Sequence, residues 1–166
     1  AWMTPLDDDI LMSQMSIPGT NKSFTYSSTT SQFETQFQTI ENQLNIGIRA
    51  FELSVANYEE YVFLGDNVDR GLYTYARQAT GMANRYCALS DIFDAFKTFL
   101  SSNATKDEAV VVVINHYTET TSEILSTGFA AKMKTFLEGY RCVTESDLAN
   151  LTLRDCRGKI LVLSRD

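Results

Sequence analysis

Histidine and cysteine, the usual ligands of structural zinc, are scarce in this sequence of 166 residues. It has a single histidine, His116, and three cysteines, Cys87, Cys142 and Cys156, none of which belongs to a CxxC pair. Structural zinc sites use four such ligands, usually in closely spaced pairs. The sequence therefore supplies no zinc site, and we expect the protein to bind neither a metal ion nor a cofactor.

Long apolar runs and clustered basic residues are also missing. No run approaches the roughly 20 apolar residues that a bilayer-spanning helix needs. The N-terminal AWMTPLDDD has neither the basic start nor the apolar core of a signal peptide. Lys and Arg number 14 against 21 Asp and Glu, which gives a net charge of −7, and the basic residues are scattered. We expect no transmembrane segment and no nucleic-acid partner.

Three N-x-Ser/Thr sequons, at Asn21, Asn103 and Asn150, are candidate glycosylation sites. Cys142 and Cys156 lie close in sequence and are a candidate disulfide, which would leave Cys87 free or paired outside this chain. Glycans and disulfides belong to oxidising compartments, so these features indicate a secreted protein. The alternative is chance, because such tripeptides are common in chains rich in Ser and Thr.

The length and the 44% apolar composition are typical of one globular domain, which we place at residues 1–166. Four short apolar runs predict strands. Their near-continuous apolar character, clearest in the VVVVI of residues 110–114, is typical of strands buried on both faces of a parallel sheet. The four runs are Leu11–Ile17, Ile48–Val55, Ala109–Ile114 and Ile160–Leu163.

Helical patterns lie between these runs. One apolar stripe has spacings of four, three and four residues, as on one face of a helix: Phe33, Phe37, Ile40 and Leu44. Ser90 is expected to cap a second helix, whose apolar residues extend to Leu100. A third helix is expected over Thr121–Glu138. Residues 65–86 are polar and rich in tyrosine, and we expect a long loop there.

Strands alternating with helices predict an α/β fold with right-handed crossovers. An open doubly wound sheet is the alternative to a barrel, but no glycine-rich phosphate loop follows the first predicted strand.

Four motifs then resemble, in this order, the X region of phosphatidylinositol-specific phospholipases C. They are MSIPGT at 15–20, GIRAFEL at 47–53, VVVVINHY at 110–117 and RGKILVLSR at 157–165. The resemblance extends from about Trp2 to Asp166. It implies the N-terminal half of a TIM-like (βα) barrel, with about four parallel strands and intervening helices. Such a half barrel has open strand edges, so we expect further residues or a second chain to complete it.

Members of this family cleave phosphodiesters with two histidines, a carboxylate that orients one of them, and an arginine or a calcium ion at the phosphate. The resemblance places Asn21 at the first histidine and Lys22 at the carboxylate that follows it. An amide cannot accept and hold a proton near neutral pH, so the general base is missing. Arg70, before Gly71-Leu72, falls at the second histidine, although an alternative alignment puts Gly65 or Asp66 there.

The second strand keeps an acidic residue, Glu52, but Ser54 replaces the phosphate-binding arginine. Glu52 alone, with Lys22 across the site, does not provide a calcium site. Asn115 and His116 match a motif at the barrel rim, where we expect no part in catalysis. Arg49 matches an arginine that we expect to be buried with a carboxylate partner.

The resemblance therefore predicts a pseudoenzyme that acts as a binding or assembly module. Lys22, Arg70 and Arg165 are candidates for an anion pocket that binds a phosphate-bearing small molecule or a lipid headgroup. The alternative is an active phosphodiesterase with Glu52 as base and with Lys22 and Arg165 clamping the phosphate. In a third hypothesis, a missing C-terminal part carries the function.

Overall fold

A computed structural model describes residues 1–21, 23, 39–58, 71–76, 85–116 and 129–164. These residues form a mixed sheet of seven strands with the order β4-β3-β2-β5-β7-β6, and β1 pairs in addition with β2. The strands are β1 Gly19–Thr20, β2 Ala50–Tyr58, β3 Gly71–Ala76, β4 Arg85–Ala88, β5 Val110–His116, β6 Arg141–Cys142 and β7 Ile160–Ser164. The helices are η1 Met12–Gln14, α1 Ile40–Ile46, α2 Leu89–Ser101, α3 Phe129–Leu137, α4 Glu145–Asn150 and α5 Leu153–Cys156.

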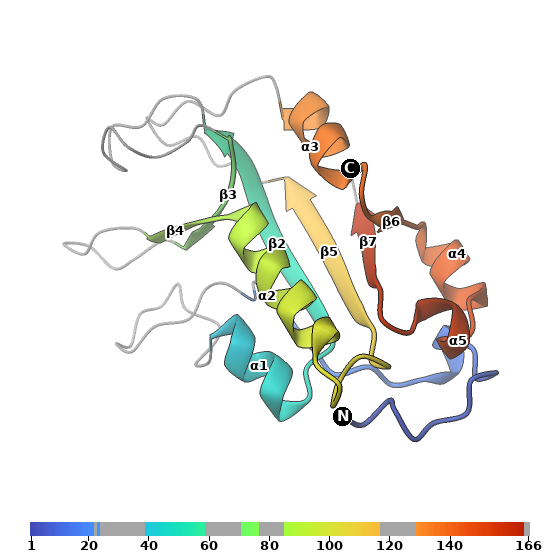
Figure 1. Cartoon of the computed structure of the whole chain (residues 1–166). Helices are drawn as coiled ribbons and strands as arrows, with labels where there is room; N and C mark the ends of the chain where they lie inside the picture. Colours follow the sequence, from blue (N-terminus) through green and yellow to red (C-terminus); the bar gives the residue numbers. More distant parts are fainter. Residues whose placement is uncertain (22, 24–38, 59–70, 77–84, 117–128, 165–166) are drawn as a thin grey trace.

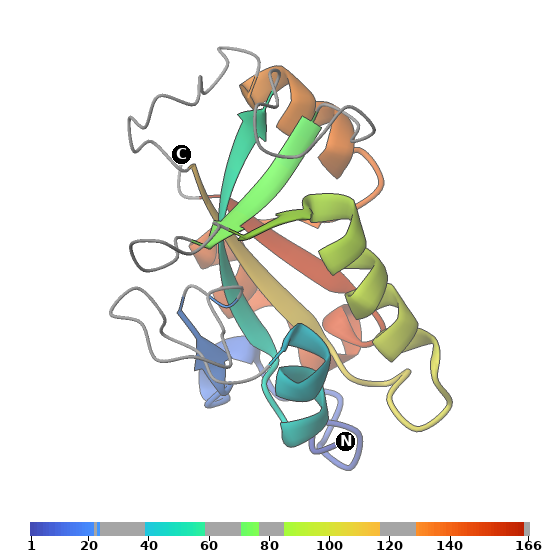
Figure 2. The same cartoon turned by 90° about the vertical axis from the view of Figure 1, so that its left-hand side faces the viewer.

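Three of the four predicted strands are confirmed as the parallel centre of the sheet. β2 pairs with β5 from Ala50 opposite Val111, and β5 pairs with β7 from Val110 opposite Ile160. β2 continues to Tyr58, beyond the predicted end at Val55. The unclosed sheet with its helices, seen edge-on in Figure 2, is a half barrel, as predicted.

The predicted strand over Leu11–Ile17 is wrong. Met12–Gln14 form a 3-10 helix, and only the two residues of β1, further along, pair with β2. The apolar residues of this run are used for packing: Met12 is buried in a cluster with Leu153 and Val111. An apolar run can be explained by burial in the core in any local conformation, so its apolar character did not require a strand.

The long loop predicted over residues 65–86 is also wrong in part, because it contains β3 and the start of β4. β3 runs antiparallel to β2 with Val55 opposite Thr74, and β4 runs antiparallel to β3 with Thr74 opposite Cys87. Leu72 packs against the core on the helix side, and the Thr74 hydroxyl donates a hydrogen bond to the Cys87 carbonyl oxygen of β4. Residues 59–70 and 77–84 lie outside the described part of the chain.

The three predicted helices correspond to α1, α2 and α3 in the part of the chain that the structure describes, whereas α4 and α5 were not predicted. Thr39 caps α1, with its Oγ1 accepting a hydrogen bond from the Asn42 N–H at 3.2 Å, and Gly47 ends the helix with a φ of 112°. Phe33, Phe37 and residues 117–128 lie outside the described residues. Ser90 is not the N-cap of α2, because β4 leads directly into the helix and Ala88 takes the cap position.

Alternation along the strands gives the sheet two different faces. The helix face, which α1, α2 and α3 cover, carries buried residues of all three central strands, among them Phe51, Val112 and Val162. In Figure 1, α2 lies in front of β2 on this side. The opposite face, called here the inner face, carries Ala50, Val111, Val113, Leu161 and Leu163, which pack against the N-terminal segment and α5.

The N-terminal segment is held to the sheet by polar contacts. The indole N–H of Trp2, the only tryptophan in the chain, donates to the Gly47 carbonyl oxygen at 2.8 Å. Arg157, at the end of α5, binds the Asp8 carboxylate at 2.7 Å and donates to the carbonyl oxygens of Met3 and Leu6. These bonds join residues about 150 positions apart in sequence and fix the segment across one end of the sheet.

A buried ion pair lies where β2 and β5 begin. Arg49 and Glu108 are 2% and 0% exposed, and Arg49 Nε lies 2.8 Å from Glu108 Oε2. Burial alone would raise the pKa of Glu108, but hydrogen bonds from Arg49 and from the hydroxyl and N–H groups of Thr4 outweigh it and lower this pKa. The prediction that Arg49 is buried with a carboxylate partner is confirmed.

Candidate functional site

The carboxyl ends of the parallel strands carry a small polar group on the inner face. Glu52 and Ser54 of β2 share this face, and Asn115 of β5 lies opposite Ser54 in the register. The Asn115 amide donates a hydrogen bond of 2.5 Å to Glu52 Oε1. All three side chains are half-buried. The pairing of β2 with β5 thus brings together the acidic residue that the sequence singled out and one of its predicted rim residues.

The turn after β1 is fastened directly to Glu52. The Ser23 N–H donates to the Glu52 carbonyl oxygen at 2.8 Å, and the Glu52 N–H donates to Ser23 Oγ at 3.0 Å. Ser23 is fully buried and also donates to the Thr20 carbonyl oxygen. Asn21 lies within this turn and is exposed. The turn that carries Asn21, which the sequence places at a predicted catalytic position, is therefore held to β2 by one backbone–backbone bond and one bond to the Ser23 side chain.

Gln43 of α1 supports the same turn and was not predicted as a site residue. Its Nε2 donates to the Ser23 carbonyl oxygen at 2.9 Å, and its Oε1 accepts from the Thr20 hydroxyl at 2.7 Å. Gln43 is 1% exposed and lies on the face of α1 that buries Ile40 and Leu44. A polar residue on an apolar helix stripe indicates buried hydrogen bonding, and this signal could have identified it.

His116 points to the other side of the sheet. In β5 it lies on the same face as Val112 and Ile114, which is the helix face. Its ring stacks on that of Phe129 in α3, with the ring centroids 3.9 Å apart and the ring planes at 10°. Asn115, one residue earlier, faces Glu52. The only histidine of the chain is thus packed under α3, on the face opposite the Glu52 carboxylate.

Several predicted site residues lie outside the described part of the structure: Lys22, Arg70 and Arg165. The candidate anion pocket that they were predicted to form stays a prediction. Within the described ranges, no three His, Cys, Asp or Glu side chains gather closely enough to hold a metal ion. The described helices also include none that is long and apolar enough to span a membrane.

The candidate modification sites are placed more clearly. Asn21, Asn103 and Asn150 are all exposed. The three cysteines are all described, and each is a free thiol: Cys142 is exposed in β6, Cys156 is buried in α5 and Cys87 is half-buried. The Cys142–Cys156 bridge is therefore not formed in this structure. Burial, the largest cause, raises the pKa of the Cys156 thiol, which leaves it a weak nucleophile.

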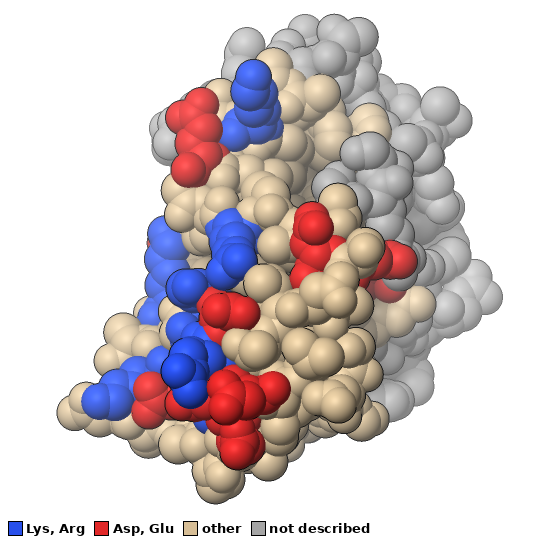
Figure 3. Space-filling view, turned by 90° about the vertical axis from the view of Figure 1, so that its right-hand side faces the viewer, with Lys and Arg blue, Asp and Glu red and all other residues tan. Residues whose placement is uncertain are grey.

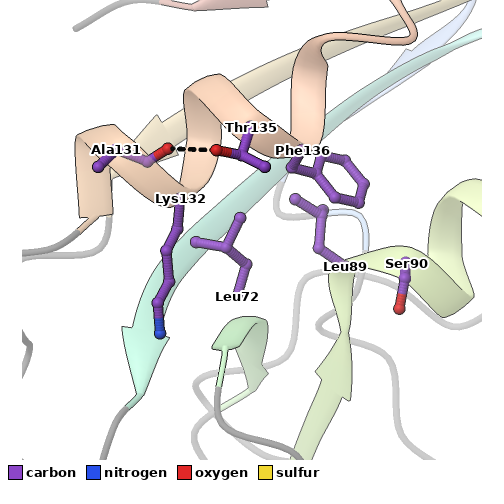
Figure 4. Close-up of a pocket in the computed structure, with 7 residues that line it drawn as sticks. All are labelled: Leu72, Leu89, Ser90, Ala131, Lys132, Thr135 and Phe136. Atoms are coloured by element: carbon purple, nitrogen blue, oxygen red, sulfur yellow. Dashed lines mark hydrogen bonds between the residues drawn. The ribbon is translucent and has the colours of Figure 1, made fainter.

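A cavity of about 440 Å³ lies on the helix face between β3, α2 and α3 (Figure 4). Leu72, Leu89 and Phe136 form its apolar wall, and Lys132 and Ser90 are its main polar lining. The hydroxyl of Thr135 donates to the Ala131 carbonyl oxygen at 3.2 Å, within α3. The described residues of this lining include no carboxylate or imidazole to move a proton, so the group around Glu52 remains the better candidate for chemistry.

The Glu52 group has limited chemical means. A carboxylate can accept a proton, but the amide of Asn115 can only orient it, because an amide neither gives nor takes a proton at neutral pH. Ser54, beside Asn115, brings no positive charge for a phosphate. The described group therefore has a single titratable residue, Glu52.

Comparisons with known proteins give a consistent picture of the fold. Neither a scan against protein-family models nor a search of curated proteins found a match. Among solved structures, two variants of phosphatidylinositol-specific phospholipase C from Staphylococcus aureus match with TM-scores of 0.68 and 0.70 and sequence identities of 22% and 23%. A form of the same enzyme that contains pentafluoro-phenylalanine matches with a TM-score of 0.70 and 19% identity.

These matches cover 99% of this chain but only 51 to 52% of each phospholipase chain. At this level of identity they establish the shared fold. The described sheet and helices therefore share the fold of about half of the phosphatidylinositol-specific phospholipase C barrel.

Proposed function

We propose that this chain is a phospholipase C-like module that has lost phosphodiester cleavage and serves in binding or assembly. One observation supports this most strongly: Glu52 is paired with the amide of Asn115, while the only imidazole of the chain is stacked on Phe129 on the opposite face. Cleavage of a phosphodiester by an attacking hydroxyl needs a base, an acid for the leaving group and positive charge at the phosphate. Glu52 could supply the first of these three alone.

With the purified chain, a fluorogenic phosphatidylinositol substrate is expected to be hydrolysed no faster than in buffer without protein. Glu52→Gln should leave this rate unchanged. Glu138→Gln, an exposed position with the same loss of charge, is the matched control. Turnover that is abolished in Glu52→Gln but kept in Glu138→Gln would instead support the second function, a phosphodiesterase with Glu52 as base. Loss of a catalytic base typically costs about 10²- to 10⁴-fold in rate, so this difference is easily measured.

We further propose that another polypeptide segment completes the barrel, either in the same protein or in a second chain. Among the described residues, β1 pairs with β2 alone, and β7 pairs on its outer side only with the two residues of β6. Open strand edges attract other strands. The chain alone should therefore self-associate, or bind the segment that completes it, as measured by light scattering after size-exclusion chromatography. A monodisperse monomer that unfolds cooperatively would contradict this proposal.

Secretion and glycosylation form part of the same proposal. The three sequon asparagines are exposed, as an acceptor must be. Glycan masses on their peptides, after expression through a eukaryotic secretory pathway, would support it, and unmodified peptides would count against it. A bound phosphate-bearing molecule or lipid headgroup at the rim, through Lys22, Arg70 and Arg165, would give the module its ligand.

A further inference from the structure

A second cavity of about 440 Å³ opens on the helix face at the end of the sheet where β7 begins. Its walls come from three places in the sequence: the last turns of α2, the turn between α3 and β6, and the residues that enter β7. Glu52 and Asn115 lie on the inner face of the sheet, opposite the helix face. The cavity is therefore separate from the candidate site described above.

Three basic side chains line this cavity, one from each wall: Lys97 from α2, Arg141 from β6 and Lys159 before β7. None of the described residues that line it is acidic. This is unusual for a chain with a net charge of −7. Figure 3 shows Lys and Arg side chains gathered in a band along one side of the surface that carries α4 and α5, with acidic side chains beside them.

The charges of Arg141 and Lys159 are not neutralised by direct contact with a carboxylate among the described residues. Both donate to the same neutral acceptor, the backbone carbonyl oxygen of Asp155, at 3.3 Å and 2.8 Å. The Asp155 carboxylate itself accepts hydrogen bonds from the N–H and the hydroxyl of Thr152, at 3.0 Å and 2.9 Å. Two cations that converge on one carbonyl oxygen leave most of their donors available to an anion.

Lys97 adds a third charge that is only loosely paired. Its Nζ lies 3.8 Å from an Asp94 carboxylate oxygen, and both side chains are more than half exposed. A hydrogen bond with Tyr140 is the main cause that raises the pKa of Lys97, so this side chain stays protonated. The same Nζ lies 5.1 Å from the centre of the Tyr140 ring, which keeps the ammonium group beside the cavity.

The remaining wall of the cavity is apolar. Leu100 and Ile160 line it together with Tyr140. Tyr140 is held by other rings, with centroids 4.8 Å from Phe93 and 5.6 Å from Phe136. A rigid aromatic and aliphatic wall beside three cations fits a ligand with an anionic head and an apolar or ring-shaped body.

We propose that this cavity binds a small phosphate monoester, with the phosphate at Arg141 and Lys159 and its organic group against Tyr140. Guanidinium groups bind phosphate oxygens in pairs, and lysine adds a point charge. This inference does not depend on the proposed loss of catalysis. Binding here would persist even if the Glu52 group proved active.

Two glycines make the proposal easy to test. Gly139 and Gly158 both line the cavity, and glycine amides resonate in a separate region of an amide NMR spectrum, so both report on ligand binding. A Cβ atom at Gly139 would meet no atom within 4 Å, and its φ is not among the positive values. Gly139→Leu should therefore add a bulky side chain at the cavity wall without a clash or backbone strain. Gly158 has a φ of 72° and is left unchanged.

The test titrates phenyl phosphate, inorganic phosphate and anionic phospholipid vesicles into the labelled chain at low ionic strength. We expect saturable shifts at Gly139 and Gly158 but not at Gly47, with phenyl phosphate binding more tightly than inorganic phosphate. The double variant Arg141→Gln/Lys159→Gln should weaken phenyl phosphate by about tenfold or more. Gly139→Leu should weaken it likewise with an unchanged melting temperature. The matched double variant Lys106→Gln/Lys134→Gln, at exposed positions outside the cavity, should stay within about twofold.

Other outcomes would overturn the proposal. One is the absence of saturable shifts at the two glycines. Another is an equal loss of affinity in both double variants, because it would indicate unspecific electrostatic attraction. Binding that fails in Lys22→Gln but survives Arg141→Gln/Lys159→Gln would place the ligand at the rim instead. A response to vesicles without any response to phenyl phosphate would identify a membrane surface as the partner and exclude a small ester.

Discussion

Replacing Glu108 with alanine is expected to lower the free energy of unfolding by about 3 to 5 kcal/mol. The substitution leaves the Arg49 guanidinium, which is 2% exposed, without its carboxylate in the interior. The remaining contacts of Arg49 are the carbonyl oxygens of Leu44 and Ile48, at 2.7 Å each, and the ring of Phe99. Neutral acceptors do not replace the lost counter-charge, so the buried cation becomes the dominant penalty.

Urea denaturation at neutral pH measures this loss. Asp94→Ala, which removes a carboxylate from the exposed Lys97 pair, is the matched control and should change stability by less than about 1 kcal/mol. The double variant Arg49→Met/Glu108→Leu should recover a large part of the loss, because it removes both buried charges together. Equal effects of Glu108→Ala and Asp94→Ala would show that the buried pair does not stabilise the fold.

The same pair predicts how stability depends on pH. Because the folded pKa of Glu108 is lowered below its ordinary value of 4.5, the unfolded state binds its proton more readily than the folded state does. Its contribution is complete above the unfolded pKa and is lost as the pH falls through the lower folded value. The difference in unfolding free energy between the wild type and Glu108→Gln should therefore be constant from about pH 7 to 5 and shrink below about pH 4. A difference that grows toward acid pH would contradict this assignment.

Phe93→Ala is expected to cost about 3 to 5 kcal/mol of unfolding free energy. Phe93 is fully buried in α2 and is the centre of an aromatic group, with its ring centroid 5.6 Å from Phe96, 5.0 Å from Phe136 and 4.8 Å from Tyr140. Truncation removes the contact through which α2 holds α3 and the turn that follows it. The cavity left behind adds to the loss of buried area.

Two controls separate this packing effect from a general loss of apolar surface. Phe93→Leu keeps most of the volume and should cost less than half as much. Ile46→Ala removes an apolar side chain that is 69% exposed and should change stability by no more than about 0.5 kcal/mol. Thermal and urea unfolding would measure all three variants, and a small loss in Phe93→Ala would mean that α3 is held mainly by other contacts.

Continuous apolar strands were the easiest part of the fold to predict. β5 and β7 are buried on both faces, so their residue types alone identify them. β3 was missed although its tyrosine and threonine residues favour a strand, because it is short and lies within a polar segment that was interpreted as one loop. The apolar run at Leu11–Ile17 was wrongly predicted to be a strand. Its apolar residues are packed in the core, but they do not pair with a neighbouring strand in a ladder.

The candidate site was predictable in its composition but not in its contacts. Glu52 and Asn115 were both singled out from motifs, yet their hydrogen bond depends on the register between β2 and β5, which no local pattern specifies. The direction of His116 could have been predicted, because it is two residues from Ile114 in a strand whose alternate residues share a face. The anchoring role of Ser23 arises from the turn after β1 and has no sequence signal of its own.

The position of Trp2 gives the protein an internal optical probe. Because the chain has one tryptophan and its indole is bonded to the carbonyl that ends α1, intrinsic fluorescence reports one event, the attachment of the N-terminal segment to the rest of the fold. Circular dichroism reports the helices and the sheet. If both signals are followed during heating, they would show whether the N-terminal segment detaches before the rest of the fold unfolds or whether the whole chain unfolds in one step.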